Sequence, residues 1–213
     1  MPHPKIRVYK FIDSRWGLTA LCDRRLKISE VLRTNDPWEL APFEVSNSCQ
    51  EQAMRKSRED IAKLTGLMCF SGGWNHPIMW SHYAEQHRGL CLGFDLPNDP
   101  TKVLKVRYKP TLQPFPKKVE DVNELLAKKI LTVKNACWLY EEEYRWFPSM
   151  NEKRHGIAYV DFGVELQLTE VLLGMKCELE QTSIKRLVGE ESKSVEVKAV
   201  NCSKRKYEMV IDQ

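Results

Sequence analysis

The sequence lacks the local patterns that hold a structural metal or a disulfide framework. Its seven cysteines include no C-x-x-C pair, so no close ligand pair begins a zinc site. Cys69 and Cys91 stand between apolar neighbours, where a free thiol packs as a small hydrophobic group. We therefore expect structural thiols, no bound metal and a reducing compartment.

Long apolar runs and a strong charge of one sign are also missing. No stretch approaches the roughly 18–20 apolar residues that cross a bilayer, and residues 1–11 have no apolar core of signal-peptide length. The net charge of +4 permits a phosphate-bearing ligand but does not indicate a nucleic-acid binder. We expect a cytoplasmic protein without membrane contact.

Three widespread catalytic motifs do not occur. The chain contains no G-x-x-x-x-G-K-[ST], no G-x-S-x-G and no H-E-x-x-H, which argues against a P-loop nucleotidase, a nucleophile-elbow hydrolase and a zinc protease.

The residues that are present predict one globular domain over residues 1–213. A length of 213 residues with 42% hydrophobic and 29% charged content is ordinary for such a domain. Strand and helix patterns mix irregularly along the chain, which favours an α+β fold over a parallel βαβ series.

Several elements are predicted from local patterns. Alternating residues over 5–11 indicate a half-buried strand, and Ser48 with Glu51 has the form of a capping box before a polar helix. Pro77 suits the first turn of a helix that runs to His87. From about residue 119 to 138, apolar residues recur at helical spacing.

The first candidate site is the segment from Cys69 to Tyr83. A strand brings Ser71 to a glycine-containing loop, which carries Asn75 and leads into the helix at Pro77, where backbone N–H groups can hold an anion. Trp80 and Tyr83 share a helix face. Packing on the sheet is the commoner role of such a face, and His82 points elsewhere.

The second candidate site is the segment from Trp138 to Arg145. In a strand, Glu141 and Glu143 share a face, with Arg145 next along it. This pattern has two interpretations: an exposed edge or internal ion pair, and a cleft in which one glutamate is a catalytic carboxylate whose charge Arg145 controls.

Two weaker candidates remain open. Tyr9 and Lys10 on the opening strand pair an aromatic ring with a cation, which can clamp a ligand, although a solvent-facing lysine is the ordinary explanation. Asp36, Glu141 and Glu143 are candidate ligands of a divalent ion in a nucleic-acid-processing enzyme, but these residues lack a recognised metal spacing.

Taken in order, these residues resemble a bacterial family catalogued as domain of unknown function 2971. The resemblance extends over most of the chain. It is carried by Tyr9-Lys10-Phe11, Arg25-Leu26, Ile28-Ser29, Asn35 through Glu39, Cys69-Phe70-Ser71, Asn75, Pro77, Met79 through Ala84, Arg88-Gly89, Gly93-Phe94-Asp95, Trp138 through Arg145 and Val171 through Gly174.

More loosely, the order of these motifs is similar to that of ADP-ribosyltransferases that modify DNA in toxin–antitoxin pairs. That similarity implies a mixed or antiparallel split sheet with flanking helices that grips NAD. It assigns the carboxylate that acts at the nicotinamide ribose to Glu143, with Glu141 second. The NAD-binding set that it implies is Tyr9, Lys10, Ser71, Asn75, Trp80, His82, Tyr83 and Arg145.

The chemistry of such a site is coherent. Breaking the bond to nicotinamide develops positive charge on the ribose, so a carboxylate favours the transition state over the ground state. The resemblance therefore implies a phage-defence or toxin protein that transfers ADP-ribose to a nucleic-acid or protein acceptor. The rival hypothesis is a non-catalytic module of a defence or stress system that binds a ligand or a partner in the same cleft.

Overall fold

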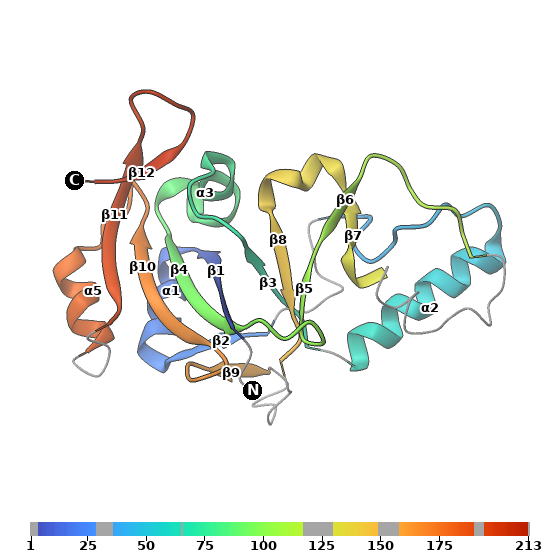
Figure 1. Ribbon diagram of the computed structural model, residues 1–213, viewed down its shortest axis with the longest axis horizontal. Helices are drawn as coiled ribbons and strands as arrows, with labels where there is room; N and C mark the ends of the chain where they lie inside the picture. Colours follow the sequence, from blue (N-terminus) through green and yellow to red (C-terminus); the bar gives the residue numbers. More distant parts are fainter. Residues whose placement is uncertain are drawn as a thin grey trace.

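The fold is built around one large open sheet. The computed structural model describes residues 4–28, 36–64, 66–116, 130–148, 158–189 and 194–212. Within these residues eight strands form the sheet, in the order β12-β11-β10-β4-β1-β3-β8-β5 (Figure 1). Every neighbouring pair is antiparallel except β10 with β11. The predicted α+β class is therefore confirmed, with a mostly antiparallel open sheet.

The strands of the large sheet have the following bounds: β1 (Lys5–Ile12), β3 (Met68–Ser71), β4 (Leu90–Pro97), β5 (Val103–Lys105), β8 (Glu143–Trp146), β10 (Gln167–Leu173), β11 (Glu196–Cys202) and β12 (Met209–Ile211). Two further pairs stand outside it in the described part of the chain, β2 (Arg25–Lys27) with β9 (Tyr159–Asp161) and β6 (Arg107–Lys109) with β7 (Val133–Asn135).

Side-chain alternation divides the sheet into two buried faces. Successive residues of a strand point to opposite sides. Accordingly Val8 of β1 lies in one apolar cluster, while Phe11 lies in the other. In β4, Leu90 and Leu92 join the first cluster and Cys91 joins the second. Both faces of the central strands are thus covered, and β4 is apolar from Leu90 to Phe94 because these residues are buried on both sides of the sheet.

Different helices cover the two faces. The first face packs against α1 (Ser14–Asp23) and α5 (Gln181–Val188). The second packs against the short helix α3 (Pro77–Tyr83). The Asp13 side chain caps α1 by accepting a hydrogen bond from the Trp16 amide at 2.8 Å. No helix in the described ranges is long and apolar enough to cross a bilayer.

The two halves of the sheet meet at a narrow junction. β1 and β3 pair at a single register position, Tyr9 opposite Ser71, whereas β1 and β4 pair from Lys5 to Ile12. The ammonium of Lys10 donates to the Cys69 carbonyl at 3.0 Å beside this junction. The sheet is continuous here through this one register position, and the Phe70 ring of β3 also packs edge-on against Phe94 of β4, with ring centroids 6.0 Å apart.

A third apolar cluster lies beyond β6 and β7, where Figure 1 shows α2 (Ser48–Leu64) at the far end of the molecule from β12. The cap of α2 differs from the predicted capping box. The Asn47 side chain accepts from the Gln50 amide at 3.0 Å, and Gln50 accepts from the Ser46 amide at 2.8 Å. The capping pair is therefore shifted one residue towards the N-terminus.

Two predicted helices end earlier than expected. Glu85, Gln86 and His87 have positive φ angles, so α3 stops at Tyr83 and a short 3-10 turn, η2 (Glu85–His87), follows. The helix expected over 119–138 falls partly on residues 117–129, which lie outside the described residues. Beyond them, residues 130–132 are helical, β7 follows, and then the 3-10 helix η4 (Ala136–Glu141).

Candidate functional site

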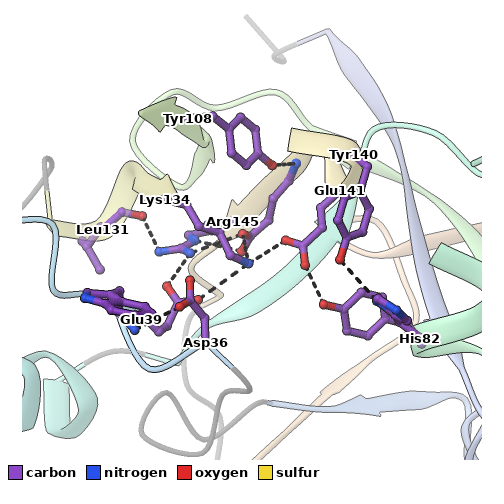
Figure 2. Close-up of polar contacts among 12 residues, drawn as sticks. Asp36, Glu39, His82, Tyr108, Leu131, Lys134, Tyr140, Glu141 and Arg145 are labelled. Carbon is purple, nitrogen blue, oxygen red and sulfur yellow. Dashed lines mark hydrogen bonds and ion pairs between the residues drawn. The ribbon is translucent and has the colours of Figure 1, made fainter. Parts of the chain in front are cut away.

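Five charged side chains are buried together where β7, η4 and β8 meet the turn at residues 36–40. They are Glu39, Lys134, Glu141, Glu143 and Arg145, and we call them the ion cluster (Figure 2). None is more than 8% exposed. Ionised side chains are rarely buried unless they are paired, so their mutual contacts decide whether this region can fold.

Arg145 is the most deeply buried cation, with no exposed surface. Its Nε donates to Oε1 of Glu143 at 2.9 Å, and its Nη2 donates to Oε1 of Glu39 at 2.5 Å. Its Nη1 donates to the Leu131 carbonyl at 2.9 Å. Glu143 and Arg145 meet because residues two apart in β8 point to the same side of the strand.

Lys134 is the second cation and links all three glutamates. Its Nζ lies 2.6 Å from Oε2 of Glu141 and 3.1 Å from Oε2 of Glu143. Oε2 of Glu39 is more distant, at 3.8 Å. The ammonium also lies 5.0 Å from the ring centroid of Trp138. Lys134 therefore ties β7 to η4, to β8 and to the turn that carries Glu39.

Aromatic side chains from α3, η4 and β6 surround the ion cluster. The Tyr83 hydroxyl donates to Oε1 of Glu141 at 2.6 Å. The Tyr108 hydroxyl accepts from the backbone N–H of Glu143 at 2.8 Å. Nδ1 of His82 lies 3.2 Å from the Tyr140 hydroxyl. These contacts join α3, which lies on the sheet, to the segment that carries the charges (Figure 2).

The two central glutamates have opposite pKa shifts. For Glu143, burial acts to raise the pKa, but the charges of Arg145 and Lys134 outweigh it and lower the pKa to about 2. For Glu141, burial raises the pKa, and Lys134 opposes this only in part. Three carboxylates face two cations, so the charges are unequal, and of the two central glutamates Glu141 is the one whose charged form burial disfavours.

The lowered pKa of Glu143 should make the stability of the protein depend on pH in the acid range. Because the pKa of Glu143 falls from its ordinary 4.5 to about 2 on folding, its contribution to stability is complete above pH 4.5 and is lost as the pH falls towards 2. The shift corresponds to about 3 kcal/mol. Urea unfolding measured between pH 6 and pH 2 should show a shallower loss of stability in Glu143→Gln than in wild type.

The exposed Glu178 offers the matched control, because Glu178→Gln should keep the wild-type slope in this range. Parallel curves for wild type and Glu143→Gln would mean that the ion pairs of Glu143 do not hold its charge.

Ser71 and Lys10, two further predicted residues, direct their polar atoms to the backbone. Ser71 stands opposite Glu143 across β3 and β8 and opposite Tyr9 across β3 and β1. Its hydroxyl donates to the Gly73 carbonyl at 2.8 Å. Lys10 follows Tyr9 in the strand, so the two side chains point to opposite faces of the sheet. The Lys10 ammonium donates to the Cys69 carbonyl.

Asn75 and Trp80 lie on the α3 side of the sheet. The Asn75 carbonyl accepts from the Met209 amide at 2.7 Å and so fixes β12 to the loop before α3. Trp80 is fully buried, donates its indole N–H to the Trp74 carbonyl at 2.6 Å and meets the Phe11 ring edge-on at 5.2 Å. Trp80 therefore has the environment of a core residue.

Lys134, Glu39 and Tyr108 belong to the site although sequence reasoning did not select them. Lys134 follows Val133 inside a stretch read as an amphipathic helix. In the sequence, Glu39 stands out only as the last residue of the Asn35–Glu39 segment that carries the family resemblance. A lone charged residue within an apolar stretch was the available signal, since such a residue needs a buried partner of opposite charge.

A pocket of about 180 Å³ opens beside the ion cluster. Its walls are mostly apolar and carry two lysines and no carboxylate. They are formed by Trp38, Ala41, Pro42, Lys109, Pro110, Thr111, Leu112, Val133, Lys134 and Asn135. Lys134 is the residue shared by the pocket and the ion cluster.

Asp36 does not join Glu141 and Glu143 in a metal site. One of its oxygens accepts from the Trp38 amide at 2.9 Å, and the other is buried without a hydrogen-bond partner. Among the residues whose placement is described, no group of three or more His, Cys, Asp or Glu side chains is arranged to hold a metal ion. The divalent-ion hypothesis therefore finds no ligand set there.

Residues 79–146 match the model of a family described as protein of unknown function, DUF2971. This segment is about a third of the chain and includes four members of the ion cluster, Lys134, Glu141, Glu143 and Arg145. The match supports the resemblance to that family over these residues. No curated protein and no solved structure matches the chain significantly.

Proposed function

We propose that the chain is a small-ligand-binding module in which the ion cluster holds the walls of the pocket in place. The observation that carries this proposal is the state of the two glutamates. Both oxygens of Glu141 and both oxygens of Glu143 already accept hydrogen bonds from side chains of the protein. Both side chains are also buried, and neither lines the pocket, so neither presents an oxygen to a ligand bound there.

Each of the three segments that line the pocket includes a sequence neighbour of a residue at the ion cluster. Trp38 precedes Glu39, and Lys109 follows Tyr108. Val133 and Asn135 flank Lys134 on both sides. Three chain segments that are far apart in sequence are thus fixed to one another within one residue of the pocket surface.

This arrangement suits binding for a thermodynamic reason. Ordering loops and side chains upon binding costs free energy, and a site that is rigid beforehand avoids most of that cost. Loop residues held by buried contacts are also positioned more accurately than free loops. The buried ion pairs supply rigidity that the short strands β6 and β7, with three residues each, cannot supply alone.

The proposal predicts that small molecules perturb Trp38. Nuclear magnetic resonance of the indole N–H groups, with a set of one-ring aromatic acids, amides and amines together with NAD, should show concentration-dependent shifts of the Trp38 signal. Trp16 is similarly exposed, at 56% against 54%, and lies on α1, so its signal should stay still. The proposal would be contradicted if no compound of the set shifted the indole N–H signal of Trp38.

The second candidate function is NAD-dependent ADP-ribosyl transfer, in which Glu143 is the first choice for the catalytic carboxylate and Glu141 is the second choice. Two observations favour it: Glu143 stands directly opposite Ser71, and its lowered pKa keeps it anionic, as stabilisation of a positively charged ribose requires. The connection of the two sheet halves through a single pair is also compatible with a sheet that opens around NAD.

Release of nicotinamide from NAD tests this candidate. Transferase chemistry requires release by the wild-type chain and its loss in Glu143→Gln, measured with nucleic-acid and protein acceptors present. Equal background rates in both proteins would exclude it, and binding of NAD without release would favour the binding module.

A further inference from the structure

We infer that the pocket beside the ion cluster takes one planar aromatic ring that carries an anionic group. The inference rests on the proposed binding function and names the class of ligand. Its three supports are the size of the pocket, the position of Trp38 and the sign of the charge along the walls.

The size of the pocket suits about one ring. An apolar cavity of about 150 Å³ accepts a benzene molecule, and this pocket has about 180 Å³. Sites for larger ligands usually measure about 300–1,000 Å³. A single ring with a small substituent therefore fits, and a ligand with several rings would leave the remainder outside.

Trp38 offers a flat apolar face on the pocket wall while remaining 54% exposed. Its backbone is held on both sides. The Asp36 side chain accepts from the Trp38 amide at 2.9 Å, and the next residue, Glu39, is bound to Arg145. Aromatic rings pack favourably in offset-stacked or edge-to-face arrangements, and a fixed indole is a suitable partner for either.

The walls favour a negative charge on that ring. Lys109 and Lys134 are the charged residues of the lining, and Lys134 already contacts Glu141 and Glu143 within 3.1 Å. Lys109 is exposed, and no salt bridge joins it to any residue of the described ranges. Its ammonium is therefore available to an incoming anion.

The position of Lys109 places this charge beside the apolar walls. Lys109 stands opposite Asn135 in the β6–β7 pair, and both residues line the pocket together with Thr111. An amide and a hydroxyl next to an ammonium match a carboxylate or a phosphate, which accepts several hydrogen bonds at once.

Benzoate and benzamide form a matched pair of probes, since they share the ring and differ in charge. We expect benzoate to shift the Trp38 indole signal with an affinity at least about threefold higher than that of benzamide, in the range for a solvent-exposed charge pair. Added salt should narrow the difference. Benzylammonium should bind more weakly than either.

Four variants locate the effect. Lys109→Gln should reduce the affinity for benzoate to that for benzamide, while Lys27→Gln on the exposed β2 position changes neither. Trp38→Ala should abolish binding of both probes, monitored by calorimetry, while Trp16→Ala leaves it intact. Thermal unfolding should be unchanged in all four, because the replaced side chains are exposed.

The outcomes separate the inference from the function beneath it. Equal affinities for benzoate and benzamide, or an unchanged preference in Lys109→Gln, would overturn the anionic class while leaving ligand binding at the pocket intact. Binding that survives Trp38→Ala would overturn the assignment of this pocket. If neither these probes nor the wider compound set moves Trp38, the inference and the proposed function fail together.

Discussion

Replacing Arg145 by methionine is expected to reduce the free energy of unfolding by about 3–5 kcal/mol. Arg145 has no exposed surface and bonds to Glu39, to Glu143 and to the Leu131 carbonyl. Its removal leaves two buried carboxylates with fewer compensating charges, which is among the costliest single changes in a protein. Urea unfolding followed by circular dichroism measures the loss.

Arg7→Met provides the comparison. Arg7 also pairs with one carboxylate, at 2.6 Å from Asp95, but its side chain is 41% exposed. Exposed pairs contribute only about 0–1 kcal/mol. If Arg145→Met were no more destabilising than Arg7→Met, the ion cluster would not be the support that we describe.

Replacing Trp80 by alanine is expected to cost a similar amount, about 3–5 kcal/mol. The side chain is fully buried against Phe11 and the second apolar cluster, and deletion of a buried aromatic ring leaves a cavity. It also removes the hydrogen bond to the Trp74 carbonyl. Thermal unfolding of the purified variant measures the effect.

The alternative role of Trp80, as the wall of a nicotinamide pocket, predicts a different result. In that case Trp80→Ala would lose affinity for NAD in addition to the stability that a fully buried tryptophan contributes. Trp16→Ala, at an exposed position of α1, should change stability by no more than about 0.5 kcal/mol and so provides the baseline.

The central strands could be predicted from the sequence because their patterns agree with their burial. β1 forms where a strand was predicted over residues 5–11, although Val8 and Phe11 are buried on opposite faces, so the strand is covered on both sides and not half-buried. The apolar run from Leu90 predicts β4, which is covered on both sides. In α5, Ile184 and Val188 lie one turn apart on the buried face. In each case the local spacing of apolar residues predicts the strand or helix, and tertiary contacts reinforce it.

The segment from residue 133 to 143 could not be predicted in the same way. Val133 lies in the stretch from about residue 119 to 138 that is predicted to be helical, yet it begins β7, because β6 pairs with this segment. The interpretation in which Glu141 and Glu143 share one strand face is wrong, because Glu141 ends η4, Glu142 has a positive φ of 45°, and β8 begins only at Glu143. Pairing with distant segments overrode the local pattern here.

Glu141 and Glu143 nevertheless both contact Lys134, for a reason that cannot be predicted from their spacing in the sequence. The left-handed residue Glu142 lies between η4 and β8, so Glu141 and Glu143 approach Lys134 from different elements. Glu142 itself is exposed. Sequence spacing placed the two acids on one strand face, but the charge of Lys134 is what brings them together.

The most direct test of the ion cluster as a framework is a double-mutant cycle between Glu39 and Arg145, which join the turn beside Trp38 to β8 at 2.5 Å. The free energy of unfolding is measured for wild type, Glu39→Gln, Arg145→Met and the double variant. The account predicts a coupling energy of at least about 1 kcal/mol, because the removal of either side chain leaves the other one buried without that partner. Effects that add within about 0.3–0.5 kcal/mol would contradict it.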